Sequence, residues 1–207
     1  MKIFIRTTGE RKLDSSIEKE LGTDYVLLID KEHKPLESFI YQLKYISEWD
    51  SLLLEDDVIL CENFLEEITK AIKSFPNKII NFFTAPFDYF TTHICIEHFV
   101  YNQCTYYPKG MSKIIAEEME KIKKPYIQYD TLENQALKRL NMVHVKFRPC
   151  LVQHIDNNTL IQNSNKIKRR TIWFIDYLKE LNIPYEEAYT KENQIKLYEF
   201  MKSKFED

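Results

Sequence analysis

The first eighty residues alternate short apolar runs with longer stretches of helical periodicity. Three runs of apolar and β-branched side chains have the length of buried strands: residues 2–6, 25–29 and 51–54. Three stretches repeat apolar side chains every three or four positions, as amphipathic helices do: residues 13–21, 36–49 and 63–75. Strand and helix in alternation predict a parallel sheet whose connecting helices cover its faces. This part of the chain is therefore expected to be α/β.

The middle of the chain continues the pattern less regularly. Residues 78–83 form a further strand candidate, and apolar and basic side chains alternate in residues 143–149 as in a half-exposed strand. Helical periodicity covers residues 109–123 and 131–140, and Asp130 stands where the second helix needs its N-cap.

The composition changes toward the end of the chain. A basic run at residues 166–170 precedes two helical stretches, residues 172–181 and 191–205. We predict an α/β domain at residues 1–164, with a mostly parallel central sheet flanked by helices. Residues 165–207 are then a C-terminal helical extension of this domain rather than a second domain.

Composition argues against several classes of protein. The net charge of −3 argues against a surface built throughout for nucleic acid, and only 3 glycines disfavour a Gly-rich phosphate loop. No apolar run approaches the roughly 18 residues of a membrane span, and Lys2 and Arg6 place charge too early for a secretory signal. The 4 cysteines are scattered without a CxxC pair. We expect a cytoplasmic protein without a transmembrane segment or disulfides, of undetermined oligomeric state.

The most informative segment for function is an acidic triplet, Glu55, Asp56 and Asp57, directly after the third apolar run. Neighbouring carboxylates repel one another, and a divalent cation such as Mg²⁺ or Mn²⁺ relieves that repulsion because oxygen ligands suit it. The carboxyl ends of strands in an open α/β sheet are also where ligands bind. The alternative is an acidic turn or helix start that holds no ligand.

The order helix, strand, Leu-Leu-Glu-Asp-Asp-Val, helix resembles the central piece of GT-A glycosyltransferases, in particular the lipopolysaccharide-type enzymes with a Leu-Glu-Asp-Asp motif. The resemblance covers residues 1–160. It implies a GT-A-like fold and a DxD-like motif whose divalent ion, Mn²⁺ or Mg²⁺, bridges the diphosphate of a nucleotide sugar. The chain departs from this family at Tyr41 and Gln42, which replace a Ser-His pair in the helix before the motif.

Several residues take donor-side roles by the same resemblance. The first strand, the loop after it and the end of the second strand correspond to the family's nucleotide-facing segments. The implied donor-binding residues are Arg6, Thr7, Thr8, Arg11, Asp30 and Asp56. An arginine fits phosphate oxygens with two parallel hydrogen bonds, although either arginine could instead be a solvated surface charge.

The metal ligands expected within this resemblance are Asp57, as the direct ligand, together with Glu55 and His154. His154 ends a late strand that resembles the family's strand near the metal. Imidazole is acceptable to Mn²⁺ and a poor ligand for Mg²⁺. The alternative is a histidine that only caps a strand end.

A general base is expected among the carboxylates at residues 125–133. Residues 125–130 resemble the segment that brings a carboxylate to the sugar, and Asp130 is our first choice, with Glu133 as the second. A positioned carboxylate can take the proton of an acceptor hydroxyl, and attack from the face opposite the leaving group inverts the anomeric centre. The alternative is an ordinary capping box between Asp130 and Glu133.

These observations lead to a metal-dependent glycosyltransferase as the first hypothesis. It transfers a sugar from a nucleotide-diphosphate sugar, with a UDP-sugar favoured, to a hydroxyl acceptor, and the reaction inverts the anomeric centre. The acceptor is a glycan, a lipid-linked glycan or a hydroxymethylated base in DNA. A phosphoryl- or nucleotidyl-transferring enzyme shares the metal but lacks a recognisable attacking group.

The second hypothesis is a nucleic-acid-binding accessory protein on a catalytically inactive α/β domain. Lys168, Arg169 and Arg170 carry clustered positive charge, and aromatic side chains follow at Trp173 and Phe174. Such a patch can contact a phosphate backbone or another polyanion. A solvated helix start is the simpler explanation of the same residues.

Overall fold

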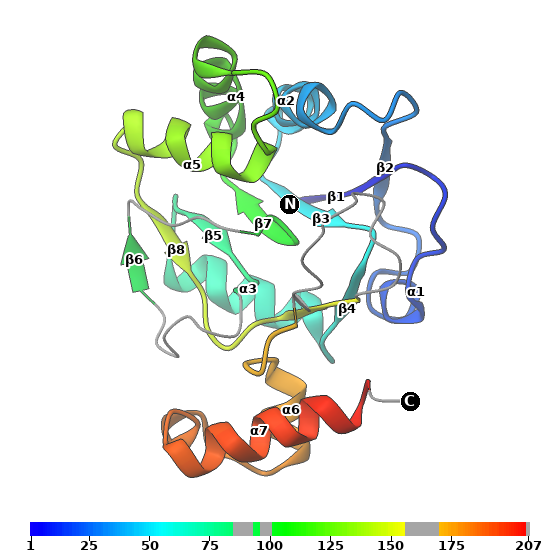
Figure 1. Cartoon of the computed structure of the whole chain (residues 1–207), viewed down its shortest axis with the longest axis vertical. Helices are drawn as coiled ribbons and strands as arrows, with labels where there is room; N and C mark the ends of the chain where they lie inside the picture. The colour runs from blue at the N-terminus through cyan, green and yellow to red at the C-terminus, as the bar shows by residue number, and fades with distance from the viewer. Residues whose placement is uncertain (85–92, 96–100, 156–169, 206–207) are drawn as a thin grey trace.

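The computed structural model describes residues 1–84, 93–95, 101–155 and 170–205 (Figure 1). The strands are β1 (Lys2–Thr7), β2 (Val26–Ile29), β3 (Ser51–Glu55), β4 (Val58–Leu60), β5 (Ile79–Asn81), β6 (His93–Cys95), β7 (Cys104–Tyr107), β8 (His144–Lys146) and β9 (Val152–His154). The helices are α1 (Ser15–Leu21), α2 (Pro35–Ile46), α3 (Phe64–Ser74), α4 (Met111–Ile122), α5 (Tyr129–Arg139), α6 (Ile175–Glu180) and α7 (Lys191–Ser203), with a 3₁₀ turn at Tyr185–Glu187.

Seven of the described strands form one central sheet, in the order β2-β1-β3-β7-β5-β8-β6. β1 lies parallel to both β2 and β3, and β5 lies parallel to β8. β7 runs antiparallel to its neighbours β3 and β5, and β6 runs antiparallel to β8. The predicted α/β class with a mostly parallel sheet is therefore confirmed, with antiparallel strands at β7 and β6.

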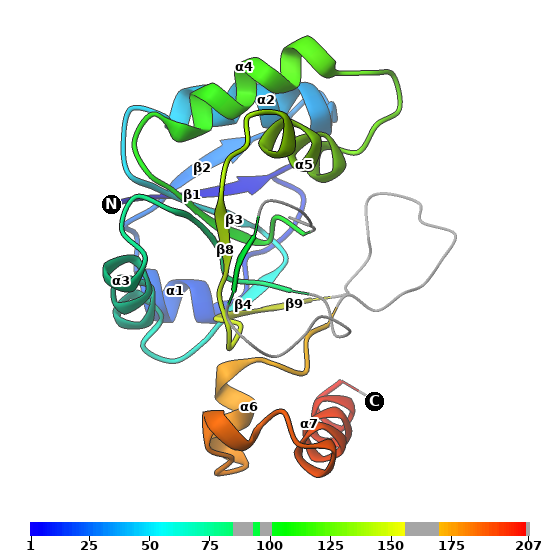
Figure 2. The ribbon, with the colours of Figure 1, turned by 90° about the vertical axis from the view of Figure 1, so that its left-hand side faces the viewer.

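Helices cover both faces of the sheet. α2, α4 and α5 lie on one face and α1 and α3 on the other, and α6 and α7 lie beyond the second layer (Figures 1 and 2). β1 and β3 are buried on both faces, so that Phe4 and Leu53 enter the core under α2, α4 and α5, while Ile5 and Leu54 enter the core on the α1 side. This two-sided burial explains why these strands are continuous apolar runs rather than alternating ones.

A second, small sheet places two distant segments side by side. β4 follows the acidic triplet immediately and pairs antiparallel with β9, so that Val58 lies opposite His154. The backbone N–H of Ile155 also donates to the carbonyl oxygen of Asp57, at 2.8 Å. The end of β9 is therefore fixed beside the acidic triplet.

The first helix, α1, has a side-chain cap at its start and a glycine after its end. The Asp14 side chain caps α1 by accepting from the backbone N–H of Ser16 at 2.8 Å. Gly22 follows its last turn with φ at 58°, a left-handed conformation that glycine adopts without a side-chain penalty.

The predicted start of α5 was wrong. The helix begins at Tyr129 with Gln128 as its N-cap, so Asp130 lies within the first turn and forms no capping box with Glu133. The reason is tertiary: the Tyr129 hydroxyl and the Glu133 carboxyl are both held by buried partners on neighbouring strands. The prediction of a half-exposed strand at residues 143–149 was also wrong. β8 lies between β5 and β6 inside the sheet, and both His144 and Lys146 are buried.

The C-terminal helices pack onto the α/β core. Phe174 pairs with Cys150 through an isolated parallel bridge. Trp173, Tyr177 and Leu197 join the same hydrophobic cluster as Leu54. Within the described residues, no helix combines the length and the apolar character that crossing a bilayer requires.

The central strand β3 provides a test of the core. Leu54 is fully buried, whereas Leu27 on β2 is 44% exposed. We expect Leu54→Ala to lower the free energy of unfolding by about 2–5 kcal/mol, because it leaves a cavity under the sheet. Leu27→Ala is the matched control and should cost about 1 kcal/mol or less. Urea denaturation measures both, and equal losses would contradict the described layering.

Candidate functional site

The acidic triplet forms a turn, named here the acidic turn (Glu55, Asp56 and Asp57), between β3 and β4. Glu55 contacts side chains from β1 and α5, while Asp56 and Asp57 contact the loop after β1. The turn thus divides its carboxylates between two sets of partners.

Glu55 is held by a guanidinium and a phenol. Arg6 Nη1 lies 3.1 Å from Glu55 Oε1, and the Tyr129 hydroxyl donates to the same oxygen at 2.6 Å. Arg6 Nε donates to Gln42 Oε1 at 2.7 Å, and the guanidinium carbon lies 4.5 Å from the ring centres of both Phe39 and Tyr129. Burial raises the pKa of Glu55 above its ordinary value, against the opposing charge of Arg6.

Asp57 is held by a second arginine and a histidine. Arg11 Nη1 bridges the turn, at 3.1 Å from Asp56 Oδ1 and 2.7 Å from Asp57 Oδ2. His154 Nε2 lies 3.3 Å from the same Asp57 oxygen. Burial alone would raise the pKa of Asp57, but the hydrogen bonds and charges of His154 and Arg11 hold it below its ordinary value.

One oxygen of this cluster lacks a partner. Asp57 Oδ1 is buried and accepts no hydrogen bond within the described part of the chain. Burying a carboxylate oxygen without a hydrogen-bond donor costs free energy. A ligand, an ion or a water bound at this oxygen would remove that cost.

The acidic turn has some of the ligands that a divalent metal requires. Among the described residues, no group of three or more His, Cys, Asp or Glu side chains is arranged to hold an ion by itself. Mg²⁺-type sites, however, use one or two carboxylates and complete their shell with substrate phosphates and water. Asp57 fits such a shared site through Oδ1, which has no donor among the described residues, and His154 beside it favours Mn²⁺ over Mg²⁺, whereas Glu55 is occupied by Arg6 and Tyr129.

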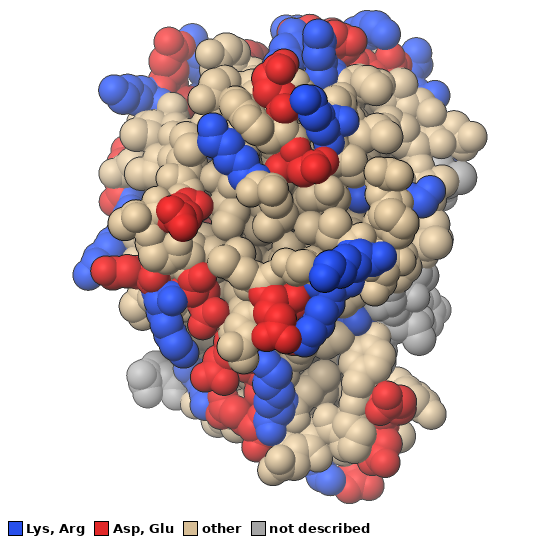
Figure 3. Space-filling model, turned by 180° about the vertical axis from the view of Figure 1, so that it is seen from behind, with Lys and Arg blue, Asp and Glu red and all other residues tan. Residues whose placement is uncertain are grey.

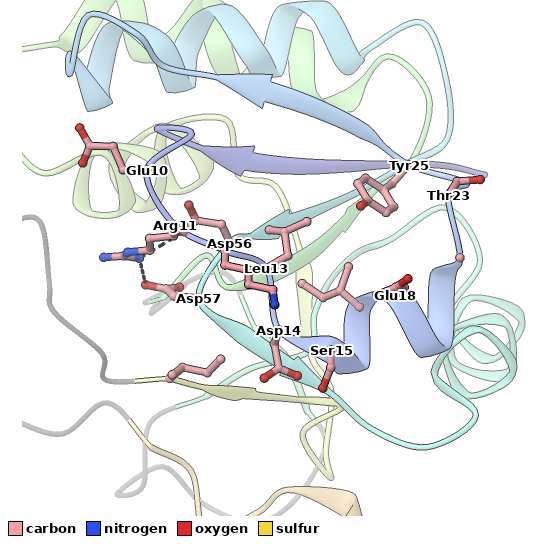
Figure 4. A pocket seen from close by; sticks show the side chains of 14 residues that line it. Glu10, Arg11, Leu13, Asp14, Ser15, Glu18, Thr23, Tyr25, Asp56 and Asp57 are labelled. Carbon is pink, nitrogen blue, oxygen red and sulfur yellow. Dashed lines mark hydrogen bonds and ion pairs between the residues drawn. The ribbon is translucent and has the colours of Figure 1, made fainter.

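A cavity of about 880 Å³, named here the α1 cavity, opens beside the acidic turn. Its walls come from the loop after β1, from α1, from the start of β2 and from Asp56, Asp57 and Ile155. Figure 4 shows Arg11 reaching across to both aspartates, while the Glu10 side chain points away from them. The cavity lies at the carboxyl edge of the sheet, and its lining includes two basic residues, Arg11 and Lys12, and five acidic residues, Glu10, Asp14, Glu18, Asp56 and Asp57.

The predicted donor-side residues divide between this cavity and its surroundings. Arg11 and Asp56 line the cavity, whereas the Arg6 guanidinium is enclosed between rings. Thr7 is buried and its Oγ1 accepts from Gly9 N, and Thr8 Oγ1 is buried without a described partner. Asp30 stands apart from the acidic turn: its backbone N–H donates to Thr7, and its side chain accepts from the backbone N–H of the residue before α2.

The two predicted bases occupy different environments. Glu133 is fully buried and accepts hydrogen bonds from the Tyr107 hydroxyl, at 2.7 Å, and from Asn102 Nδ2. Burial raises the pKa of Glu133 to about 7, although both hydrogen bonds oppose the shift. Asp130 is half-buried, and its Oδ1 accepts from the backbone N–H of Thr131 at 2.6 Å.

Sequence reasoning missed the side chains that hold Arg6, Glu55 and Glu133. These are Phe39, Gln42, Asn102, Tyr107 and Tyr129. A signal existed for Gln42, because it is a polar residue on the buried stripe of α2 and stands where the resembled family differs. The tyrosines carried no such signal, since a chain with 13 tyrosines offers many equivalent candidates.

The predicted polyanion contacts fall largely outside the described residues. Lys168 and Arg169 lie there, and Arg170 packs over the ring of Phe205 with 3.8 Å between its guanidinium carbon and the ring centre. On the face seen in Figure 3, the described acidic and basic side chains are interspersed rather than segregated. This face therefore offers no broad basic surface among the described residues.

Comparisons with known proteins leave the family open. No family model matches the chain, and no curated protein matches it. Among solved structures, the crystal structure of A197 from STIV is similar, with a TM-score of 0.45 and 12% identity over 80% of this chain and 100% of that one.

The largely buried pair between Arg6 and Glu55, whose side chains are 11% and 17% exposed, generates a stability prediction. Arg6→Gln leaves Glu55 buried without its cation, so we expect the free energy of unfolding to fall by about 3–5 kcal/mol. Arg139 also pairs with a carboxylate, Glu118, but its side chain is 62% exposed. Arg139→Gln is thus the matched control, with an expected loss of about 1 kcal/mol or less. Urea denaturation of both variants checks this, and a small loss for Arg6→Gln would show that Glu55 needs no cation.

Glu133 generates a pH prediction. Its pKa rises from 4.5 to about 7 in the folded chain, so the folded state holds the proton more tightly than the unfolded state. The stabilisation that comes from protonated Glu133 is therefore complete below about pH 4.5, and it is lost as the pH rises toward 7. Glu133→Gln imitates the protonated form and should exceed the wild type at pH 8 by up to about 3 kcal/mol.

The measurement is urea denaturation of the wild type and Glu133→Gln at pH 5 and pH 8. The two proteins should have similar stability at pH 5 and separate at pH 8. A difference that does not change with pH would mean that Glu133 is ionised throughout the range.

Proposed function

We propose that this protein is a metal-dependent glycosyltransferase of the GT-A type. It transfers a sugar from a nucleotide-diphosphate sugar, with a UDP-sugar favoured, to a hydroxyl acceptor. The observation that carries the proposal is the buried Oδ1 of Asp57, which accepts no hydrogen bond from the described residues and lies beside His154 and Arg11 on the wall of the α1 cavity.

The electrostatics of the acidic turn support a diphosphate ligand. Arg11 Nη1 pairs with both aspartates on the wall of the α1 cavity, and a guanidinium is a side chain that also binds phosphate oxygens well. Asp57 and His154 would hold a divalent ion at the same place, and a bound ion stabilises the charge that develops on a departing diphosphate. Arg11 and the turn thus form a site for an anion and a cation together.

Glu55 has a supporting role in this proposal. Arg6 and Tyr129 fix its carboxylate, so it cannot turn freely toward a metal. We propose that it maintains the conformation of the turn and orients Asp57, or faces a metal-bound water. The enclosed Arg6 then acts on the donor only through Glu55.

Asp130 remains our proposed general base. A base must reach the proton that it removes, and Asp130 lines a second open cavity, whereas Glu133 is enclosed by Tyr107 and Asn102. Attack assisted by Asp130 from the side opposite the diphosphate would invert the anomeric centre. Glu133, with a pKa of about 7, is the second choice and requires the side chains around it to move.

Thermal unfolding with ligands tests the donor and metal sites. We expect a panel of UDP- and GDP-sugars to raise the Tm by about 5–10 °C in the presence of Mn²⁺ when the ligand is at 100 times its Kd. Asp57→Asn removes a metal-binding charge and should abolish the Mn²⁺-dependent part of this shift. Asp24→Asn, an exposed aspartate before β2, is the matched control and should keep it.

Release of the nucleoside diphosphate from the same sugars then measures turnover. A Tm that no nucleotide sugar changes, with or without Mn²⁺, would contradict the proposed function. An equal shift in Asp57→Asn would contradict the assignment of the metal site.

A further inference from the structure

A second cavity, of about 630 Å³, lies between the start of α2 and the loop that joins α4 to α5. Figure 2 shows α4 crossing over α2 and the chain returning through this loop to α5. The cavity is named here the α4–α5 cavity. Its distinctive side chains are Leu36, Glu37, Tyr126, Gln128, Tyr129 and Asp130.

Tyr126 presents an aromatic ring to this cavity in an unusual way. Its side chain is fully exposed, with a relative accessibility of 104%, and its backbone has φ at 67°. A bulky residue in the left-handed region is strained, and such strain concentrates at binding and catalytic sites. A fully exposed tyrosine also leaves a large apolar surface in water. Both features are explained if the ring packs against a ligand.

Tyr129 connects the cavity to the acidic turn. Its ring lies 4.5 Å from the guanidinium carbon of Arg6, and its hydroxyl donates to Glu55. The same residue lines the cavity. Only the Tyr129 side chain therefore separates a ligand in the α4–α5 cavity from Glu55. The α1 cavity lies on the opposite side of the acidic turn.

The charges around the cavity indicate a neutral ligand. Lys123 and Lys124 contribute two positive charges, and Glu37 and Asp130 contribute two negative charges. A phosphate backbone would be repelled by the carboxylates about as strongly as it is attracted by the lysines. Carboxylate and amide oxygens accept hydrogen bonds from hydroxyl groups without requiring a charge on the ligand.

We propose that the α4–α5 cavity binds a neutral saccharide, with its C–H face packed on Tyr126 and its hydroxyl groups bound by Glu37, Gln128 and Asp130. Resting on the proposed function, we assign this saccharide as the acceptor, so that the substrate class is a glycan rather than DNA. The acceptor hydroxyl then lies at Asp130, which receives its proton as the oxygen attacks the anomeric carbon and the diphosphate departs.

The binding experiment uses the whole chain without a donor. Saturation-transfer NMR and titration calorimetry with a panel of methyl glycosides and neutral oligosaccharides measure saccharide affinity. Tyr126→Ala should weaken binding of the best saccharide at least tenfold, and Tyr126→Phe should retain it because the ring remains. Tyr189→Ala, at a tyrosine that is 61% exposed beside α7, is the matched control and should leave the affinity unchanged.

The proposal would be overturned if no saccharide binds, or if the Tyr126→Ala variant binds saccharide as well as the wild type does. It would also be overturned if a hydroxymethylated DNA duplex or free uridine binds in place of the saccharide and loses affinity in the same way in Tyr126→Ala. Circular dichroism and the Tm of each variant verify that it folds. Because this binding needs neither metal nor donor, it can succeed when the Mn²⁺-dependent shift by UDP-sugars fails. It can also fail when that shift is observed, which separates the two hypotheses.

Discussion

Charge compensation at the end of β3 is the constraint on which the site depends. Three consecutive carboxylates at one strand end repel one another, and two arginines from β1 and its following loop neutralise them. The register of the sheet makes this possible, because Arg6 lies directly opposite Glu55 in the parallel pair of β1 and β3. Arg11, in the loop that follows β1, pairs with both Asp56 and Asp57.

The same compensation makes the two halves of the acidic turn chemically different. Glu55 is immobilised by Arg6 and Tyr129, and its pKa is raised by burial. Asp57 keeps a lowered pKa and one oxygen without a described donor. An ionised carboxylate with a spare oxygen is suited to a cation, whereas a fixed and enclosed one is suited to holding the turn in place. Within the proposed site, Asp57 would therefore bind the cation and Glu55 would support the turn.

Sequence alone predicted those features that local patterns and sheet topology determine. The strand-end rule placed the acidic triplet at the carboxyl edge, and the family resemblance added His154 beside it; pairing of β4 with β9 brings Asp57 and His154 within 3.3 Å. The direction of β7 could not be predicted, because a short buried strand has the same apolar pattern whichever way it runs. The start of α5 was missed because the buried bond between Tyr129 and Glu55 outweighs the local capping preference of Asp130. Buried His144 and Lys146 likewise depend on the neighbours that β8 acquires in the fold.

The acidic turn also separates the two cavities, and this arrangement has a chemical consequence. Asp56 and Asp57 line the α1 cavity, while Glu55 reaches the α4–α5 cavity through Tyr129. A transfer between two substrates requires them to meet at one point while their binding sites remain distinct. In the proposed transferase, the turn would hold the donor diphosphate on one side and the acceptor hydroxyl on the other. Under this proposal, the contacts of Arg6 with Gln42 and Glu55, and of Glu55 with Tyr129, would keep the distance between the two sites constant.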